Sequence, residues 1–365
     1  MSLLETGHQV TDTLVVDRLL GEGAFAEVYR VRHEFLGWQA MKVFKQRSTL
    51  DQTRTLLGEA RLLSTLGHPN IVRVFDAGAV HTPEGSRGYF TMEYVAGGSL
   101  ERLVHAYPPT LRVELAVEVA EQLASGLDAA HRQDPPVLHR DLTLANILIG
   151  YDGTGMRLRI SDFGLARRAD PVTKLAGAQG TFAFMAPEVL RGHAYSRAGD
   201  MWSVGTIVYL LLTDCLPYDD GSRLSSYSPA RFARPPLPPS RYSPEVDEHL
   251  DRIVLAMLEV DPARRTGSAG VLADQLRTRR RLLAGTANPA LASNAPGSDA
   301  ADAAGPLPPP SPRALRLAEQ ALGLSRQAGQ LDRAADLLEE AVNQSPDLRV
   351  RYLSTVLLWR RGVTA

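Results

Sequence analysis

Two short polar motifs near the middle of the chain constrain its fold more than any other feature. The first, His-Arg-Asp-Leu-Thr-Leu-Ala-Asn, runs over 139–146, and the second, Asp-Phe-Gly, follows at 162–164. They place two carboxylates and one amide, those of Asp141, Asp162 and Asn146, within a short stretch of otherwise apolar sequence. Polar side chains concentrated in this way indicate a site that carries chemistry rather than part of a buried core.

A glycine-rich turn lies near the start, between two strand-like runs. Gly21 and Gly23 have no Cβ, so backbone N–H groups there can approach phosphate oxygens closely. Strand patterns on both sides exclude a dinucleotide-binding fingerprint, which needs a strand followed by a helix. Taken alone, the turn is equally typical of an ordinary hairpin.

Lys42 lies inside the next apolar strand pattern. An ammonium buried there needs an acidic partner, and Glu59, on the helix expected over 53–66, is the candidate. Taken alone, Lys42 is equally a surface residue at a strand edge.

Further motifs follow in a fixed order: Gly-Thr at 180–181, Met-Ala-Pro-Glu at 185–188, Asp-Met-Trp-Ser-Val-Gly at 200–205 and Asp-Pro-Ala-Arg-Arg at 261–265. With the turn, the lysine and the central motifs, this series resembles the protein-kinase family over about 14–282. The resemblance implies an α+β, bilobal fold. A small antiparallel-sheet N-lobe with one regulatory helix is expected over about 14–92, and a large helical C-lobe over about 96–282.

The resemblance also implies catalytic roles. Lys42 would hold the α- and β-phosphates of ATP while paired with Glu59, and Asp141 would accept or orient the proton of the substrate hydroxyl. Asn146 and Asp162 would ligate Mg²⁺, with Mn²⁺ as an alternative ion.

The nucleotide site implied by the resemblance has a gatekeeper, Met92, and a hinge, residues 93–95, whose backbone pairs with adenine. Apolar side chains form the faces around the ring. The residues of this site are Leu20, Gly21, Gly23, Val28, Ala40, Lys42, Met92, Glu93, Val95 and Leu148. Asp200 is implied to accept hydrogen bonds from the catalytic-loop backbone, and Glu188 to pair with Arg265.

Two positions depart from the family pattern. Ala26 replaces the third glycine of the turn, and Thr143 stands where Ser/Thr kinases carry a lysine that contacts the γ-phosphate. Thr181 belongs to a Gly-Thr pair that resembles the Ser/Thr-kinase signature, whose threonine hydroxyl bonds near the catalytic aspartate. We therefore expect transfer to Ser/Thr hydroxyls of proteins, with dual specificity left open by Thr143.

Two alternatives remain. One is an ATP-binding pseudokinase scaffold that assembles partners; Thr143 and Ala26 favour it, and the intact Asp141, Asn146 and Asp162 oppose it. The other is a small-molecule phosphotransferase, which the motifs at 185–188 and 200–205 oppose because in the family they shape a groove for polypeptides.

Regulation is expected in the segment after 164. Thr173 is the only threonine between Gly164 and Gly180, and a phosphate there would give Arg140 a charge-assisted partner. We expect autophosphorylation there and a role in signalling; a plain polar loop residue is the alternative.

The composition changes sharply after 282. Residues 283–312 are rich in Pro, Ala and Ser and predict a linker. Helical periodicity resumes over 313–362, where Ala334, Leu338, Ala341 and Pro346 resemble the second helix of a tetratricopeptide repeat. This tail is expected to dock a protein partner or to pack on its own.

Composition excludes other classes. With 44% hydrophobic and 22% charged residues the chain is globular, and a net charge of −1 gives no steering toward nucleic acid or an anionic membrane. The single cysteine, Cys215, suits a reducing compartment. No apolar run reaches the length of a membrane span and the start is too polar for a signal peptide, so we expect a cytoplasmic protein.

Overall fold

The computed structural model describes residues 2–45, 66–106, 113–152, 155–163, 181–218, 231–232, 234–286, 310–325, 327, 330–345, 348, 352, 355–356 and 359. The chain divides into two compact units. The larger comprises Met1–Leu100 and Pro109–Arg279, and the smaller Glu101–Pro108 and Arg280–Ala365. Each is described separately below.

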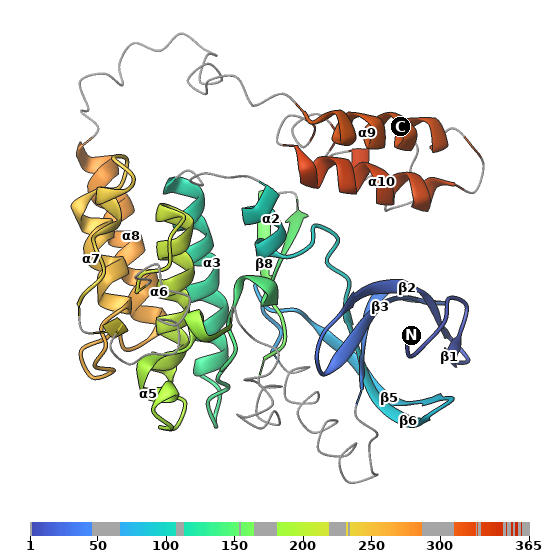
Figure 1. Ribbon diagram of the computed structural model, residues 1–365, viewed down its shortest axis with the longest axis horizontal. Coiled ribbons are helices and arrows are strands. Elements are labelled where there is room, and N and C mark those ends of the chain that lie inside the picture. Colours follow the sequence, from blue (N-terminus) through green and yellow to red (C-terminus); the bar gives the residue numbers. More distant parts are fainter. Residues whose placement is uncertain are drawn as a thin grey trace. The chain divides into compact units, whose positions relative to one another are not determined.

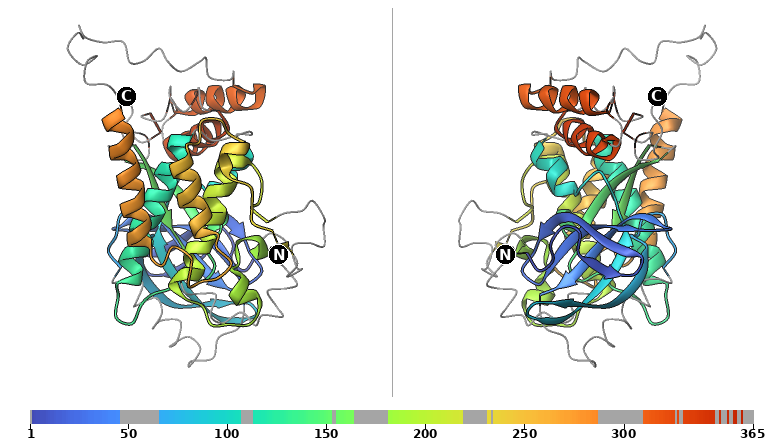
Figure 2. Two further views of the ribbon diagram at one scale, coloured as in Figure 1. Left: turned by 90° about the vertical axis from the view of Figure 1, so that its left-hand side faces the viewer. Right: turned by 90° about the vertical axis from the view of Figure 1, so that its right-hand side faces the viewer.

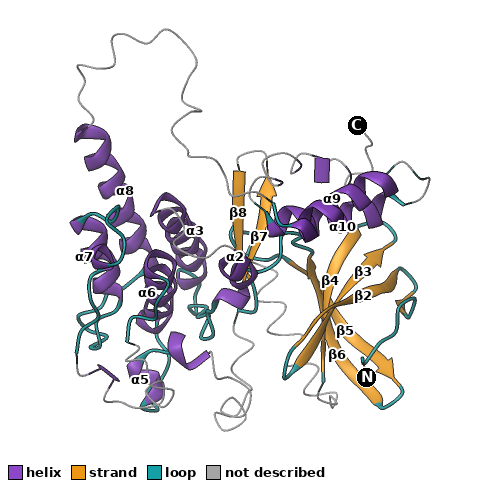
Figure 3. Ribbon diagram, turned by 45° about the horizontal axis from the view of Figure 1, so that its top comes forward, coloured by secondary structure: helices purple, strands orange, loops and turns teal. Residues whose placement is uncertain are grey.

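The larger unit begins with a twisted antiparallel sheet (Figures 1 and 3). The described residues form six strands in it, in the order β1-β2-β3-β4-β6-β5. Their bounds are β1 Gln9–Thr11, β2 Leu14–Glu22, β3 Ala26–His33, β4 Gly37–Phe44, β5 Val74–Thr82 and β6 Gly85–Glu93. Met41 and Val43 of β4 pack into the apolar core beneath the sheet. Because side chains alternate along a strand, Ala40 and Lys42 lie on the opposite face.

Strand β5 forms although three consecutive residues in it, Ala77, Gly78 and Ala79, have low strand propensity. Gly78 is needed there for packing, since a Cβ on it would lie 3.0 Å from the Tyr89 hydroxyl on the neighbouring strand.

Helices dominate the rest of the larger unit. They are α3 Val113–His131, α5 Pro187–Leu190, α6 Arg197–Thr213, α7 Glu248–Met257 and α8 Ala269–Thr286, with short 3₁₀ turns at Leu144–Asn146, Thr181–Phe184 and Pro239–Arg241. Helix α6, buried along nearly its whole length, packs against α3 and α7 (Figure 2). Helix α2, Leu100–Ala106, follows the sheet in sequence.

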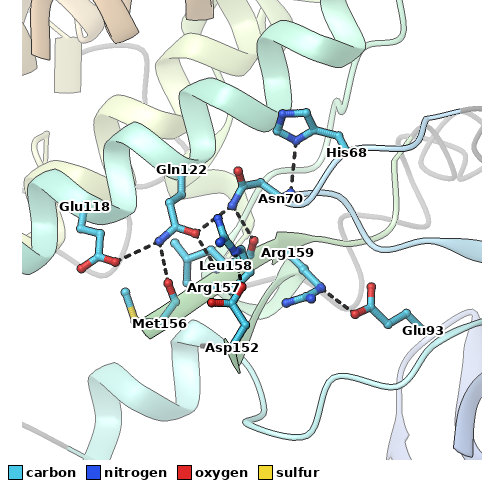
Figure 4. Close-up of polar contacts among 10 residues, drawn as sticks. All are labelled: His68, Asn70, Glu93, Glu118, Gln122, Asp152, Met156, Arg157, Leu158 and Arg159. Carbon is cyan, nitrogen blue, oxygen red and sulfur yellow. Dashed lines mark hydrogen bonds and ion pairs between the residues drawn. The ribbon is translucent and has the colours of Figure 1, made fainter. Parts of the chain in front are cut away.

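A two-stranded hairpin, β7 (Ile147–Asp152) and β8 (Gly155–Ile160), lies beside α3 and directly precedes Asp162. Asn70 and Gln122 hold it in place (Figure 4). Asn70 Nδ2 donates to the Leu158 carbonyl over 3.0 Å, and the Leu158 N–H donates to Gln122 Oε1 over 2.8 Å. Since these groups are largely buried, the hairpin is fixed to the helical lobe.

The smaller unit contains a pair of helices, α9 (Pro312–Leu324) and α10 (Leu331–Gln344), which pack against each other. Their contact is made largely of alanines: Ala314, Ala318, Ala321, Ala334, Ala335 and Ala341 are buried with Leu338. Leu348, Val356 and Trp359, which also have helical backbone, join the same core. The tail therefore has an apolar core of its own. Within the described ranges, no helix has both the length and the apolar surface to cross a bilayer.

Candidate active site

Residues 139–146 form the candidate catalytic loop, and Asp200, in the first turn of α6, holds its backbone. Its Oδ2 accepts from the His139 N–H over 2.9 Å and from His131 Nε2 over 2.8 Å, and its Oδ1 accepts from the Arg140 N–H over 2.9 Å. Asp200 is only 1% exposed, so these bonds compensate for burying its charge. The expected role of Asp200 is thus confirmed. These bonds also hold Arg140 at a φ of 71°, a strained left-handed conformation.

His139 connects the loop to the strand that precedes Asp162. Its Nε2 lies 2.8 Å from the Ser161 carbonyl and its Nδ1 accepts from the Asp141 N–H over 3.3 Å, which fits the tautomer with hydrogen on Nε2. The ring lies 4.8 Å, centroid to centroid, from Phe163. Because His139 is fully buried, it fixes the backbone of Asp141 relative to the segment that carries Asp162.

Asn146, the last residue of the first motif, is bonded both to Asp141 within that motif and to Ser161, just before the second. Its Nδ2 donates to the Asp141 carbonyl over 2.7 Å, while its own carbonyl accepts from the Ser161 N–H over 2.8 Å. With the amide nitrogen engaged in this way, the amide oxygen is the atom that remains for a ligand. Asp162 has a φ of 62°, so its backbone is left-handed as it enters the Asp-Phe-Gly motif.

The donor set fits a hard divalent cation, because a carboxylate and an amide oxygen are ligands that Mg²⁺ accepts. Over the described part of the chain, no group of three or more His, Cys, Asp or Glu side chains could enclose a metal. Mg²⁺ is commonly bound by one or two protein oxygen ligands together with water and phosphate oxygens, so Asn146 and Asp162 would suffice to hold it.

Lys42 Nζ lies 2.7 Å from Asp162 Oδ1. The sequence had predicted Glu59 as its partner, but Glu59 lies outside the described residues. The observed pair instead joins the phosphate-binding candidate on β4 to the metal-binding candidate beyond β8. Both side chains are partly shielded, at 15% and 24% exposed.

The nucleotide-site residues expected on the sheet lie close together. Val28 is the cross-strand partner of Lys42, and Ala40 is the partner of Met92. Glu93 ends β6, while Leu148 lies on β7 of the hairpin. At the mouth of this region Leu20 is 39% exposed, and neither Gly21 nor Gly23 has a strained backbone.

A small pocket lies over the catalytic loop, lined by Asp141, Thr143, Met185 and Tyr195 among others. Burial and then the charges of Asp141 and Asp200 raise the pKa of Tyr195 to about 12, so its hydroxyl stays protonated at neutral pH. Thr143 and Asp141 line the same pocket. Thr181 begins the 3₁₀ turn at Thr181–Phe184, and Thr173 lies outside the described residues.

Behind this pocket, Arg265 forms a two-pronged ion pair with Glu188, at 2.7 and 2.9 Å, as the motifs predicted. Its side chain is fully buried, donates also to the Ala198 and Glu259 carbonyls, and lies over the Trp202 ring. The pair anchors the segment that begins at 185 to the helical lobe.

Comparison with known proteins decides the family. The family model described as "Protein kinase domain" matches residues 14–276. This chain belongs to the protein kinase family. The chain is 31% identical over 283 residues to the "Serine/threonine-protein kinase PknB" of Mycolicibacterium smegmatis. The match covers 75% of this chain and 44% of that protein. The chain is 32% identical over 314 residues to the "Serine/threonine-protein kinase pkn2" of Myxococcus xanthus, covering 80% of this chain and 37% of that one.

Solved structures agree. The kinase domain of Mycobacterium tuberculosis PknI matches with a TM-score of 0.57 and 27% identity, covering 76% of this chain and 99% of that one. The kinase spans less than half the length of the curated relatives named above.

Three groups that position this kinase's site had no role in the sequence interpretation. His131, at the end of α3, carries no sequence signal for its bond to Asp200. For Ser161, the only sequence signal is its position directly before Asp162. His139 belongs to the first motif, but the motif does not indicate that its ring contacts the Ser161 carbonyl and the Asp141 N–H.

Proposed function

We propose that this chain is an ATP-dependent Ser/Thr protein kinase, transferring the γ-phosphoryl group of ATP to serine and threonine hydroxyls of protein substrates. The observation that carries the proposal is the convergence of four groups. The Lys42–Asp162 ion pair lies next to a loop in which Asn146 is bonded to Asp141. Phosphoryl transfer needs positioning and charge neutralisation more than a strong base, and these groups supply both.

The roles follow from chemistry and position. Lys42 would bind the α- and β-phosphates, leaving Asp162 for the cation when nucleotide enters. Asp141 would orient the acceptor hydroxyl and take its proton. Mg²⁺, or Mn²⁺ in its place, would be held by Asn146 and Asp162 and would supply positive charge against the phosphate oxygens.

Adenine would lie between the two lobes. Val28 and Ala40 would cover one face of the ring and Leu148 the other, with the backbone of Glu93 and Val95 at its edge and Met92 behind it. Leu20, Gly21 and Gly23 would cover the phosphates. Cross-strand pairing of Ala40 with Met92 and of Val28 with Lys42 supports this arrangement.

Ser/Thr acceptors are supported by the Gly-Thr pair at 180–181 and by the names of the bacterial relatives. Thr143 lacks the charge of a lysine, so one contributor to charge neutralisation at the γ-phosphate is missing. Its place in the pocket beside Asp141 makes Thr143 the residue to change when acceptor choice is tested.

Thr173 is proposed as a site of autophosphorylation. The support is Arg140, whose buried Nε has no hydrogen-bond partner among the described residues. A phosphate oxygen would satisfy that donor and order the segment.

The helical tail is proposed as a tetratricopeptide-like docking module for a protein partner, after the linker predicted at 283–312. Ala334, Leu338 and Ala341, which carry the resemblance, are buried in its core, so the outer helix faces would carry the contact. For the whole chain, the proposed use of ATP and the single cysteine, Cys215, fit a cytoplasmic location.

The test is incubation of the purified chain with γ-labelled ATP, Mg²⁺ and a mixed protein acceptor, beside Asp162→Ala. Label on serine or threonine that the variant does not produce supports the proposal. Measurable ATP binding without label on the chain or the acceptor would contradict it and favour a scaffold.

A further inference from the structure

The backbone of β8 is immobilised on both sides of Arg159. The Leu158 carbonyl and N–H are bonded to Asn70 and Gln122, as described above. The Ile160 N–H donates to the Asn70 carbonyl over 2.8 Å, and the Ile160 carbonyl accepts from the Val72 N–H over 2.9 Å. Arg159 thus projects from a backbone segment that is anchored by hydrogen bonds on both sides.

The side chain of Arg159 reaches away from α3 to the end of β6 (Figure 4). Its Nε lies 2.7 Å from Glu93 Oε1, and the two side chains are 20% and 29% exposed. Glu93 ends the last strand before the connection to the helical lobe, and its N–H donates to the Arg73 carbonyl over 2.8 Å. The ion pair therefore ties the hinge to the hairpin.

The same hairpin carries the proposed floor of the adenine pocket. Leu148 on β7 is the direct cross-strand partner of Arg159. A Cβ on Gly150 would lie 2.9 Å from Arg159 Nη1 and 3.5 Å from Val95 Cγ1. The missing side chain at Gly150 thus leaves the room that the guanidinium occupies beside the hinge.

The hinge connection also lies directly on β7. The Ile149 N–H donates to the Gly98 carbonyl over 2.8 Å, and a Cβ on Gly97 would collide with the Ile149 carbonyl. Backbone contacts thus hold the end of the connection, at Gly97 and Gly98, on the hairpin. At the start of the connection, the side chain of Glu93 is bonded to the hairpin through Arg159.

We propose that Arg159 is a positioning residue that, through Glu93, fixes the height of the hinge above Leu148 and so sets the affinity of the site for adenine. The inference rests on the proposed function, because it concerns the same nucleotide site. Arg159 need not touch the nucleotide: the hinge backbone at Glu93 and Val95 meets the ring edge, and the floor meets its face. A loosened hinge would weaken adenine binding while leaving the phosphate and metal groups in place.

The chain supplies matched variants. Arg159→Gln removes the ion pair, and Arg159→Lys keeps the charge. Arg157→Gln is the control, since Arg157 lies on the same strand but pairs with Asp152 inside the hairpin, at 2.8 Å. Gly150→Ala tests the geometry independently, because the added methyl would displace the guanidinium without straining a left-handed backbone.

The experiment measures calorimetric binding of adenosine and ADP to the full chain, with ATP kinetics for each variant and thermal melting to verify folding. We expect Arg159→Gln to weaken adenosine and ADP binding and raise the KM for ATP about fivefold, the equivalent of about 1 kcal/mol. Its kcat should stay within about twofold, a change under about 0.5 kcal/mol. Arg159→Lys should restore most of the affinity, Gly150→Ala should weaken it in the same direction, and Arg157→Gln should match the wild type.

Adenosine affinity that is equal in Arg159→Gln and Arg157→Gln would overturn the inference, as would a fall in kcat without any change in KM. Because the primary readout is adenosine binding, a failure of this inference can be told apart from a failure of the kinase proposal. Adenosine affinity that depends on Arg159 in a chain that transfers no phosphate would leave the inference standing and refute the kinase. Phosphoryl transfer with an ATP KM that does not change in Arg159→Gln would support the kinase and refute the inference. A wild-type chain that binds no adenosine would also refute the inference.

Discussion

The catalytic loop and the glycine-rich turn serve the same proposed reaction but are built in opposite ways. Around the loop, His139 and Asp200 are 0% and 1% exposed, and their polar groups are bonded to the backbone they support. Around the turn, Leu20 and Phe25 are 39% and 45% exposed. Buried polar contacts therefore hold the loop in place, whereas the glycine-rich turn leaves large apolar side chains exposed to solvent.

The largest effect is expected at Lys42, where the two regions meet. Lys42→Met should lower kcat about a hundredfold or more, at least as much as Asp141→Asn, because it removes a charge aimed at the phosphates. Stability should change by less than about 1 kcal/mol, since the Lys42–Asp162 pair is partly solvated. Steady-state kinetics and urea unfolding measure both quantities. Lys45→Met is the control, because Lys45 pairs with Glu22 on the exposed turn; a Lys42→Met variant that keeps most of its kcat would contradict the assignment.

The next effect tests whether the loop is assembled by the fold. Asp200→Ala leaves the buried donors of His131, His139 and Arg140 without their acceptor. We expect a loss of about 3 kcal/mol in unfolding free energy, with activity falling as well. Asp128→Ala serves as the control, since Asp128 pairs with the exposed Arg132 and should change stability by less than about 0.5 kcal/mol. Equal unfolding midpoints for the two variants in urea would show that Asp200 does not support the loop.

A smaller effect separates glycines that serve the nucleotide from glycines that serve packing. A Cβ on Gly23 would meet nothing closer than the Ala26 carbonyl at 3.6 Å, whereas a Cβ on Gly205 would lie 2.7 Å from Met257. Gly23→Ala should therefore keep its melting temperature and raise the KM for ATP about fivefold, because the methyl occupies space that phosphates approach. Gly205→Ala should instead lose about 1–3 kcal/mol of stability through overpacking. A Gly23→Ala variant with a lowered melting temperature and an unchanged KM for ATP would contradict this distinction between the two glycines.

The smallest effect lies in the helical lobe, away from both regions. Asp247 caps α7 by accepting from the Leu250 N–H over 2.9 Å and from Arg279 over 2.7 Å. Partial burial acts to raise the pKa of Asp247, but these hydrogen bonds outweigh it and hold the pKa below its ordinary value. A carboxyl of this kind stabilises the fold above the ordinary aspartate pKa of about 4, and the contribution is lost as pH falls through the lowered value.

Asp247→Ala should therefore cost about 1 kcal/mol at pH 7 and less as pH falls toward 3, with kcat unchanged. Chemical unfolding of wild type and variant across this pH range measures the difference. A cost that stays constant with pH would contradict the electrostatic part, and a reduced kcat would contradict the separation of stability from chemistry.

The sequence motifs singled out the candidate site residues and two of the contacts that support them, those of Asp200 with the loop backbone and of Glu188 with Arg265, but not the others. Asp141, Asn146 and Asp162 could be singled out because they lie in short motifs that resemble those of a known family. Long helices such as α3 were also predictable, since burial along one face imposes a helical period. By contrast, the pairing of Arg159 with Glu93 depends on how two distant segments lie in space, and neither local sequence contains a signal for it.

The measurement that tests the central claim most directly follows ATP binding and phosphoryl transfer together in wild type and Asp141→Asn. We predict similar affinity for ATP and Mg²⁺ in both proteins. Label on serine or threonine should form with the wild type and fall at least about a hundredfold in the variant. Equal transfer by both proteins would contradict the role of Asp141, and binding without transfer by the wild type would contradict the kinase itself.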